Sequence, residues 1–399
     1  MIEQLRRWFF DHVCQTSAQP LGIDVARAEG ARLWDHTGQV YLDLLAGMGV
    51  ANLGHGHPAV VRAIHEQAER YLHVAVYGEM ILEPQVRLAR ELAQVSPGEL
   101  SVVYFSNSGA EAIEGAMKTA RKLTERSRFI AFEGAFHGDT MGALSLNGNA
   151  LYREPFEPLV PVVDFLPFGD LEALERIGHD VAAVFVEPVQ SEGGVRIPPD
   201  EFLPRLRQRC RQVGALLVFD EVLTGFGRTG KLFAANHWEV VPDVLVLAKA
   251  LGGGLPLGAF VGTQEVMHTL SENPPLAHVT TFGGHPLSCA AGLAALRVLL
   301  EENWIGRAAQ LGSRWLAELQ KALAGRVRDV RGIGMLLGIE FDSAGRTRHF
   351  VERCRARGLI ANWTLHCDHV VRLLPPLTIA ERDLEDATRI MADVSRTLG

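Results

Sequence analysis

Six short runs of apolar residues recur between residues 100 and 265, and stretches of helical length separate most of them. Runs this apolar are typical of strands that are covered on both faces, as in parallel sheets. The pattern predicts an α/β fold in which a mostly parallel central sheet carries helices on both faces. The six predicted strands lie near residues 102–105, 129–132, 181–186, 216–219, 244–248 and 259–262.

The two ends of the chain predict a second structural unit. Residues 32–43 have the pattern of a β-hairpin, and a long helical pattern runs from residue 286 to about 300. A chain of 399 residues that is 47% hydrophobic exceeds the size at which single cores usually stop growing. We expect residues 56–300 to form a large domain and residues 301–399 a smaller α+β domain, which residues 1–55 join.

Lys249 stands directly after the apolar run 244–248 and shortly before three consecutive glycines at 252–254. Ammonium groups are rarely buried without a purpose. A buried lysine readily loses its proton and forms imines with carbonyl compounds. By base rate alone a surface lysine is the commoner explanation, but the neighbouring segments favour a catalytic one.

Asp220 ends the apolar run 215–219. Ligand sites in parallel sheets lie at the carboxyl ends of strands, so we expect Asp220 and Lys249 at one rim. A carboxylate can keep a heteroaromatic nitrogen protonated while a lysine holds an aldehyde. This pair is the recurrent protein contribution to pyridoxal phosphate chemistry.

A third segment could bind the phosphate of such a cofactor. Residues 102–118 predict a strand, a polar turn and the start of a helix. Ser108 can cap that helix, with Glu111 completing a capping box. The free amide groups of Gly109 and Ala110, at the positive end of the helix dipole, would suit a phosphate.

Residues 225–231 offer a competing nucleotide motif, because they fit G-x-G-x-x-G and most of a P-loop. Leu232 stands where a P-loop has the Ser or Thr that binds magnesium. No phosphate-binding helix clearly follows, and no acid lies in the required strand-end position. Nucleotide binding is therefore not expected.

Taken together, these segments resemble the class III aminotransferases, pyridoxal phosphate enzymes of fold type I, from about Tyr41 to Leu377. The resemblance implies that Lys249 holds the cofactor aldehyde and that Asp220 faces its ring nitrogen. It implies that Phe136 stacks on the ring beside His137, that Gln190 approaches the ring hydroxyl and that Val222 packs under the ring. It also implies phosphate contacts from Ser108, Gly109 and Ala110 and, across a homodimer interface, from Thr281 of the neighbouring subunit.

Four further positions bear on the substrate. In several relatives a glutamate and an arginine, here Glu192 and Arg372, pair until a 2-oxo acid displaces the glutamate; an ordinary ion pair is the alternative. Tyr77 lies in a segment that resembles a pocket wall. Acetylornithine and ornithine aminotransferases have an arginine after the Phe-x-Gly segment, where this chain has Asp139. An acid there would repel a carboxylate, which points away from N-acetylornithine and towards another ω-amino donor.

The resemblance implies a ping-pong transfer of an amino group, from an amine or amino acid donor to a 2-oxo acid such as 2-oxoglutarate. Three alternatives remain open. The first is another reaction on the same fold, either an aminomutase isomerisation or a decarboxylating transamination. The second is a nucleotide enzyme built on residues 225–231. The third is a protein that binds the cofactor without turnover.

Composition agrees with a cytoplasmic enzyme. The net charge is −8 and no basic block occurs, so nucleic-acid binding is not expected. No apolar run is long enough for a membrane span or a signal peptide. The five cysteines lack paired or metal-like spacing, and the histidines at 55 and 57 have no further ligand nearby, so no metal is expected.

Overall fold

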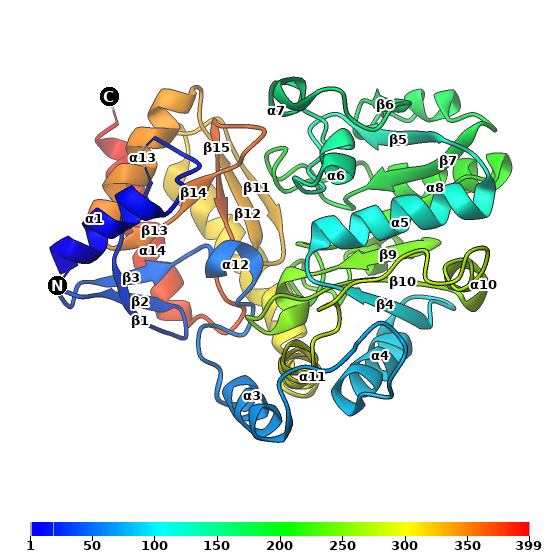
Figure 1. The fold of residues 1–399 in the computed structure, drawn as a ribbon. Helices are drawn as coiled ribbons and strands as arrows, with labels where there is room; N and C mark the ends of the chain where they lie inside the picture. The colour runs from blue at the N-terminus through cyan, green and yellow to red at the C-terminus, as the bar shows by residue number, and fades with distance from the viewer. Residues whose placement is uncertain (1, 19, 399) are drawn as a thin grey trace.

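A computed structural model gives the fold of the chain and describes residues 2–18 and 20–398. Residues 1 and 399, the two ends of the predicted smaller domain, thus lie outside the described residues, as does residue 19. Three β-sheets form the framework (Figure 1), one of seven strands and two of four.

The seven-stranded sheet has the order β4-β10-β9-β8-β7-β5-β6. Strands β5 to β9 run parallel, and β10 is antiparallel to both of its neighbours. All six predicted strands are present. The sheet strands are Val102–Ser106 (β4), Arg128–Phe132 (β5), Val163–Leu166 (β6), Val181–Val186 (β7), Leu216–Asp220 (β8), Val244–Leu247 (β9) and Gly258–Gly262 (β10).

Strand β6 was not predicted, and its position explains why. It lies at the edge of the sheet, pairs only with β5, and three of its four residues are only partly buried. An edge strand does not need the continuous apolar run that marks β7, in which every residue is buried.

Helices cover both faces of this sheet, as expected. Helix α5 crosses the front of the sheet in Figure 1, and α8 lies behind it. Helix α11 begins and ends close to the predicted positions and packs against α3 and α4. The helices of this part are Pro58–Arg70 (α3), Glu83–Val95 (α4), Gly109–Thr124 (α5), Met141–Ser145 (α6), Ala150–Arg153 (α7), Phe202–Val213 (α8), Ala235–Trp238 (α9), Gln264–His268 (α10) and Pro286–Glu301 (α11).

The two smaller sheets lie on the other side of the molecule (Figure 1). One has the order β1-β2-β3-β13 and contains the predicted hairpin, in which Trp34 pairs with Val40. Strand β13, from the C-terminal region, adds to β3 in parallel. The other sheet has the order β11-β12-β15-β14. These strands are Val25–Glu29 (β1), Arg32–Asp35 (β2), Val40–Asp43 (β3), Asp329–Ile333 (β11), Leu336–Glu340 (β12), Leu359–Ile360 (β13), Asn362–Trp363 (β14) and Val370–Leu373 (β15).

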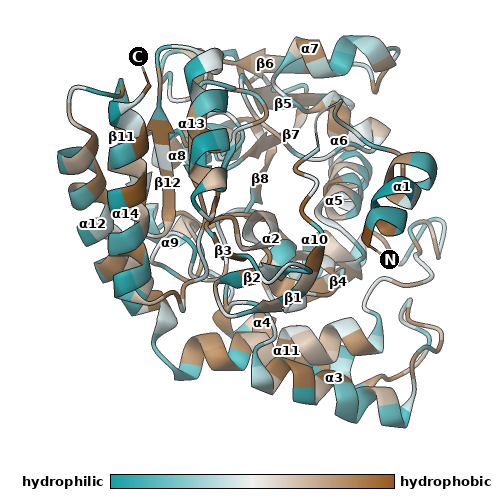
Figure 2. Ribbon diagram, turned by 90° about the vertical axis from the view of Figure 1, so that its left-hand side faces the viewer, coloured by the Kyte–Doolittle hydropathy of each residue, from teal (hydrophilic) through white to brown (hydrophobic). Residues whose placement is uncertain are grey.

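Amphipathic helices cover these sheets. In Figure 2, α12 and α14 carry alternating hydrophobic and hydrophilic bands, and the two helices pack together. In α12 the buried positions Leu311, Trp315 and Leu319 recur at helical spacing. The helices outside the large sheet are Ile2–His12 (α1), Ala46–Gly49 (α2), Trp304–Leu323 (α12), Ala344–Ala356 (α13) and Glu381–Arg396 (α14). Within the described part of the chain, none of the helices combines the length and hydropathy that a bilayer span requires.

The nucleotide-like segment 225–231 joins the two halves of the molecule. It forms consecutive turns, and the fully buried Arg228 donates to the carbonyls of Met335 (3.0 Å) and Pro375 (2.6 Å) and to Asn52 (2.6 Å). The first backbone N–H of α9, at residue 235, already donates to the Glu221 carboxylate at 2.8 Å and is therefore not free to bind a phosphate. The segment is therefore a structural junction between the two halves.

Candidate active site

A cavity of about 420 Å³ opens at the carboxyl ends of the parallel strands. Its volume lies within the ~300–1,000 Å³ that is common for small-molecule sites. Segments that follow five strands meet there, together with Val50 and the residues before β10. The lining residues from those segments are Asn107, Ser108, Gly109, Ala110, Phe136, His137, Gly138, Glu187, Ser191, Glu192, Asp220, Val222, Leu223, Ala248 and Lys249.

Lys249 follows β9 and begins a short 3₁₀ turn, Lys249–Gly252. Its φ of 50° lies in the left-handed region, a conformation that costs a residue other than glycine energy and that clusters at functional sites. Burial, together with the nearby positive charge of Arg372, lowers the pKa of Lys249. A larger share of this amine is therefore neutral, and nucleophilic, than for an exposed lysine.

Asp220 ends β8 and lies against His137. Its Oδ2 is 2.7 Å from Nδ1 of His137, and its Oδ1 accepts the N–H of Val222 at 3.0 Å. Since a carboxylate can only accept, Nδ1 carries the proton of this contact. Nε2 of His137 is buried and has no partner among the described residues. The imidazole fixes one carboxylate oxygen and the backbone fixes the other.

Glu187 is a further carboxyl group in this wall, and no residue pattern marked it as a site residue. Its two oxygens accept the N–H groups of Phe136 (3.0 Å) and Ser191 (3.1 Å). Burial, with added repulsion from Asp220, raises the pKa of Glu187 to about 7. Glu187 therefore ties two segments of the cavity wall together.

The start of α5 has the predicted arrangement with one difference. Ser108 Oγ accepts the N–H of Glu111 at 3.2 Å, but the Glu111 carboxylate returns to the N–H of Asn107 at 2.8 Å, one residue before the cap. The first amides of a helix have no acceptor within the helix. A Cβ on Gly109 would meet Val222 Cγ2 at 2.8 Å, so glycine allows the helix to start this close to β8.

Glu192 lies between the cavity and Arg372. Glu192 lines the cavity, whereas Arg372 is 1% exposed and does not. Nη1 of Arg372 contacts Oε1 of Glu192 and donates to Ser191 Oγ at 2.8 Å. Burial by itself would raise the pKa of Glu192, but Arg372 and the Leu365 amide outweigh it, and the pKa lies below its ordinary value. The arginine is thus covered by an ionised carboxylate.

Four predicted site residues lie outside the cavity of this chain. Gln190 is fully buried behind the wall, where its amide donates to the Glu133 carbonyl at 3.0 Å and accepts from Arg196 at 3.3 Å. The expected approach of Gln190 to the cofactor ring therefore does not fit its position. Tyr77, Asp139 and Thr281 are exposed and do not line the cavity.

The residues of the cavity fit pyridoxal phosphate. A lysine with a lowered pKa, a buried carboxylate whose geometry is fixed, and a helix start with free amides face one space. Phe136 and Val222 supply apolar walls, as a heteroaromatic ring requires. Among the described residues, no three or more His, Cys, Asp or Glu side chains are placed to hold a metal ion.

Comparison with known proteins agrees with this geometry. The family described as aminotransferase class-III matches residues 13–394, so the chain belongs to the class III aminotransferases, pyridoxal phosphate-dependent enzymes of fold type I.

Two relatives are acetylornithine aminotransferases. The protein of Methanopyrus kandleri is 47% identical over 382 residues, which cover 94% of this chain and 95% of the relative. That of Methanothermobacter thermautotrophicus is 42% identical over 376 residues, 93% of each chain. Among solved structures, the ornithine aminotransferase of Toxoplasma gondii is similar, with a TM-score of 0.92 and 34% identity, covering 99% of this chain and 95% of the other.

Proposed function

We propose that this aminotransferase moves an ω-amino group from an amine or amino acid donor to a 2-oxo acid such as 2-oxoglutarate. The observation that carries the proposal is one cavity in which Lys249 and Asp220 face the same space and Glu192 covers a buried arginine. A protein that bound the cofactor without turnover would have no need of an acceptor-binding arginine.

Pyridoxal phosphate supplies an electrophilic carbon and an electron sink when it is bound. Lys249 would hold it through its amine and, once released, its Nζ would carry a proton from the donor carbon to the cofactor's reactive carbon, and in the opposite direction in the second half-reaction. Asp220 would keep the ring nitrogen protonated, and His137 fixes the orientation of that carboxylate. Phe136 and Val222 would supply the apolar walls against the ring.

The phosphate would be held at the start of α5 by Ser108, Gly109 and Ala110, because free amides and the helix dipole favour an anion. Thr281 of the neighbouring subunit would complete this cradle. Its exposed position outside the cavity of its own chain supports a role across an interface. Gln190 has no role in this proposal because its amide is engaged elsewhere.

Arg372 would bind a carboxylate of the 2-oxo acid after Glu192 moves aside, since its planar guanidinium suits a carboxylate. Asp139 is exposed outside the cavity but directly follows Gly138, which lines it, so its charge would disfavour a donor with a carboxylate at that place. We therefore favour a donor whose second end is an amine or is apolar. N-Acetylornithine and ornithine are the named substrates of relatives and serve as the reference donors.

A homodimer with two composite sites is the assembly that we propose. Large apolar side chains are exposed next to Thr281 and Tyr77, and a second copy would cover them. They are Leu72, Met80, Ile81, Leu276, Val279 and Phe282. Light scattering at several concentrations tests this, and a monomer at all of them would contradict it. Five free cysteines support a location in the reducing cytoplasm.

The decisive assay follows amino transfer from a panel of donors, with and without 2-oxoglutarate. Turnover that depends on the acceptor supports the proposal. Sustained product formation without any acceptor would indicate an aminomutase instead.

A further inference from the structure

Glu192 is held over Arg372 by a second group besides the guanidinium. The loop between β14 and β15, residues 364–369, donates two backbone N–H groups to it. The N–H of Leu365 reaches Oε2 of Glu192 at 2.7 Å, and the N–H of His366 reaches the Glu192 carbonyl at 3.0 Å. We call residues 364–369 the latch loop.

Tyr152, on α7 of the large part, fixes the latch loop. Its hydroxyl donates to the Leu365 carbonyl at 2.9 Å. Its ring stacks on His366, with centroids 5.0 Å apart and planes at 28°. His366 in turn meets Phe136 edge-on at 5.7 Å, beside the cavity. The carbonyl that accepts from Tyr152 and the N–H that donates to the Glu192 carboxylate therefore belong to the same residue, Leu365.

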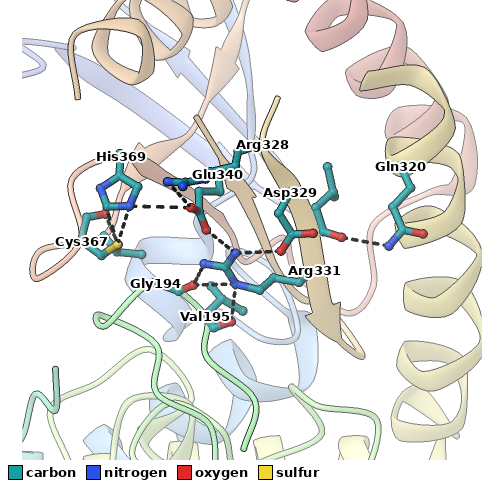
Figure 3. Close-up of polar contacts among 11 residues, drawn as sticks. Gly194, Val195, Gln320, Arg328, Asp329, Arg331, Glu340, Cys367 and His369 are labelled. Carbon is teal, nitrogen blue, oxygen red and sulfur yellow. Dashed lines mark hydrogen bonds and ion pairs between the residues drawn. The ribbon is translucent and has the colours of Figure 1, made fainter. Parts of the chain in front are cut away.

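The segment that carries Glu192 is itself held firmly at its other end. Figure 3 shows Arg331 of β11 donating to the carbonyls of Gly194 and Val195, both at 3.0 Å. Glu340 pairs with Arg331 at 2.6 Å and keeps it in place. A Cβ on Gly194 would meet Cys367 Sγ of the latch loop at 3.0 Å, so the two segments pack closely.

Because both ends of this arrangement are fixed, the Glu192 side chain is the part that can move. Uncovering Arg372 breaks two contacts of the carboxylate, one to the guanidinium and one to the Leu365 N–H. Only molecules in which Arg372 is uncovered, the open fraction, can bind an acid there. The apparent Kd for an acid is therefore the intrinsic Kd divided by the open fraction.

We infer that Tyr152 is a specificity-determining positioning residue that, through the Leu365 amide, sets how often Glu192 uncovers Arg372. The inference rests on the proposed roles of Glu192 and Arg372. A loosened latch raises the open fraction, so dicarboxylates bind more tightly, while binding of amines without a carboxylate is unaffected. Tyr152 thereby balances the two substrate classes that share one cavity.

The test uses glutarate, a dicarboxylate with no 2-oxo group, titrated into the pyridoxal phosphate-loaded enzyme by calorimetry. Tyr152→Phe keeps the stacked ring and removes only the hydroxyl. We expect its Kd for glutarate to fall about 3- to 10-fold, as a modest population shift predicts. The rate of the half-reaction with a carboxylate-free amine should stay within about twofold. Tyr41→Phe, which removes a hydroxyl 3.4 Å from Asp35, is the matched control because neither residue lines the cavity, and it should leave both unchanged.

A double-mutant cycle with Glu192→Ala tests whether Tyr152 acts through Glu192. In that background the arginine is always uncovered, so Tyr152→Phe should no longer change the Kd. An unchanged or weaker Kd in the single variant, or an equal effect in both backgrounds, overturns the inference. If Glu192→Ala itself fails to tighten glutarate binding, the proposed gate is at fault, and the inference fails with it.

Discussion

Nδ1 of His137 and Oδ2 of Asp220 lie 2.7 Å apart, and both side chains are buried beside the cavity. His137 thereby fixes an oxygen of the one carboxylate that lines the cavity at the end of β8. The negative charge is held in place before any ligand arrives, and such preorganised charge is a major source of rate enhancement.

Asp220→Asn should lower kcat by about 10²- to 10³-fold, the range found when one preorganised electrostatic contact is lost. The amide keeps the shape and removes the charge, so cofactor binding should weaken less than turnover. Steady-state kinetics at saturating pyridoxal phosphate measures this. Asp200→Asn, an exposed aspartate after β7, is the control. A kcat within about fivefold of the parent would contradict the role of Asp220.

The stability of the cofactor-free protein should depend on pH through Glu221. Burial raises the pKa of Glu221 from 4.5 to about 7, although three hydrogen-bond donors oppose the shift. The folded protein therefore keeps this proton up to about pH 7, whereas the unfolded chain releases it near 4.5. The stabilisation is full below pH 4.5 and is lost as the pH rises to about 7. It amounts to about 3 kcal/mol at ~1.36 kcal/mol per pKa unit.

Urea unfolding between pH 4.5 and 8 checks this expectation. The decline of the free energy of unfolding should be shallower in Glu221→Gln, whatever the offset between the two proteins. Glu187 has a similarly raised pKa, so some decline should remain. Glu318→Gln on the exposed face of α12 should reproduce the parent profile. If the free energy of unfolding changed with pH in the same way in Glu221→Gln and in its parent, the protonation of Glu221 would have no effect on stability, which would contradict this expectation.

Asp139→Arg should raise kcat/KM for N-acetylornithine by at least about tenfold, since each ~1.4 kcal/mol of new carboxylate binding is a factor of ten. A guanidinium would replace a repelling charge beside Phe136 with a bidentate partner. Competition between N-acetylornithine and a carboxylate-free amine reports the change. Asp200→Arg, at the exposed aspartate after β7, controls for added positive charge on the surface. If Asp139→Arg showed no preference for N-acetylornithine over the carboxylate-free amine, Asp139 would have no role in substrate selection.

Gly115→Ala should destabilise the fold by about 1–3 kcal/mol, the usual cost of overpacking. A Cβ on Gly115 would meet Phe260 Cε1 at 2.3 Å, where α5 packs on β10. Gly345→Ala is the opposite case, because nothing lies within 4 Å and the residue is in helix α13. That variant should be neutral or gain up to about 1 kcal/mol. Equal effects of the two variants on urea unfolding would contradict the packing argument.

The central sheet was predictable because its strands are buried on both faces and their apolar runs are unbroken, as in β7. Lys249 and Asp220 were found because a charged residue directly after such a run is conspicuous. The edge strand β6 lacks that signal. Glu187 was missed because only the folded chain shows that its oxygens join the Phe136 and Ser191 backbones.

Gln190 lies behind the cavity wall for a reason that only the folded chain shows. The bridge between Gln190 and Arg196 and the contact between their side chains hold its amide there. The Leu365 amide could not be foreseen either. It is a backbone group, 173 positions from Glu192, so no residue type marks it.

The most direct test of the account is the visible spectrum of the purified protein with added pyridoxal phosphate, for the parent and for Lys249→Ala. We predict a visible band in the parent that survives removal of free cofactor and is absent after the same treatment of Lys249→Ala. An amine donor should abolish the band, and 2-oxoglutarate should restore it. A parent protein that never acquires the band, or a Lys249→Ala variant that retains it, would contradict the central claim that Lys249 holds the cofactor.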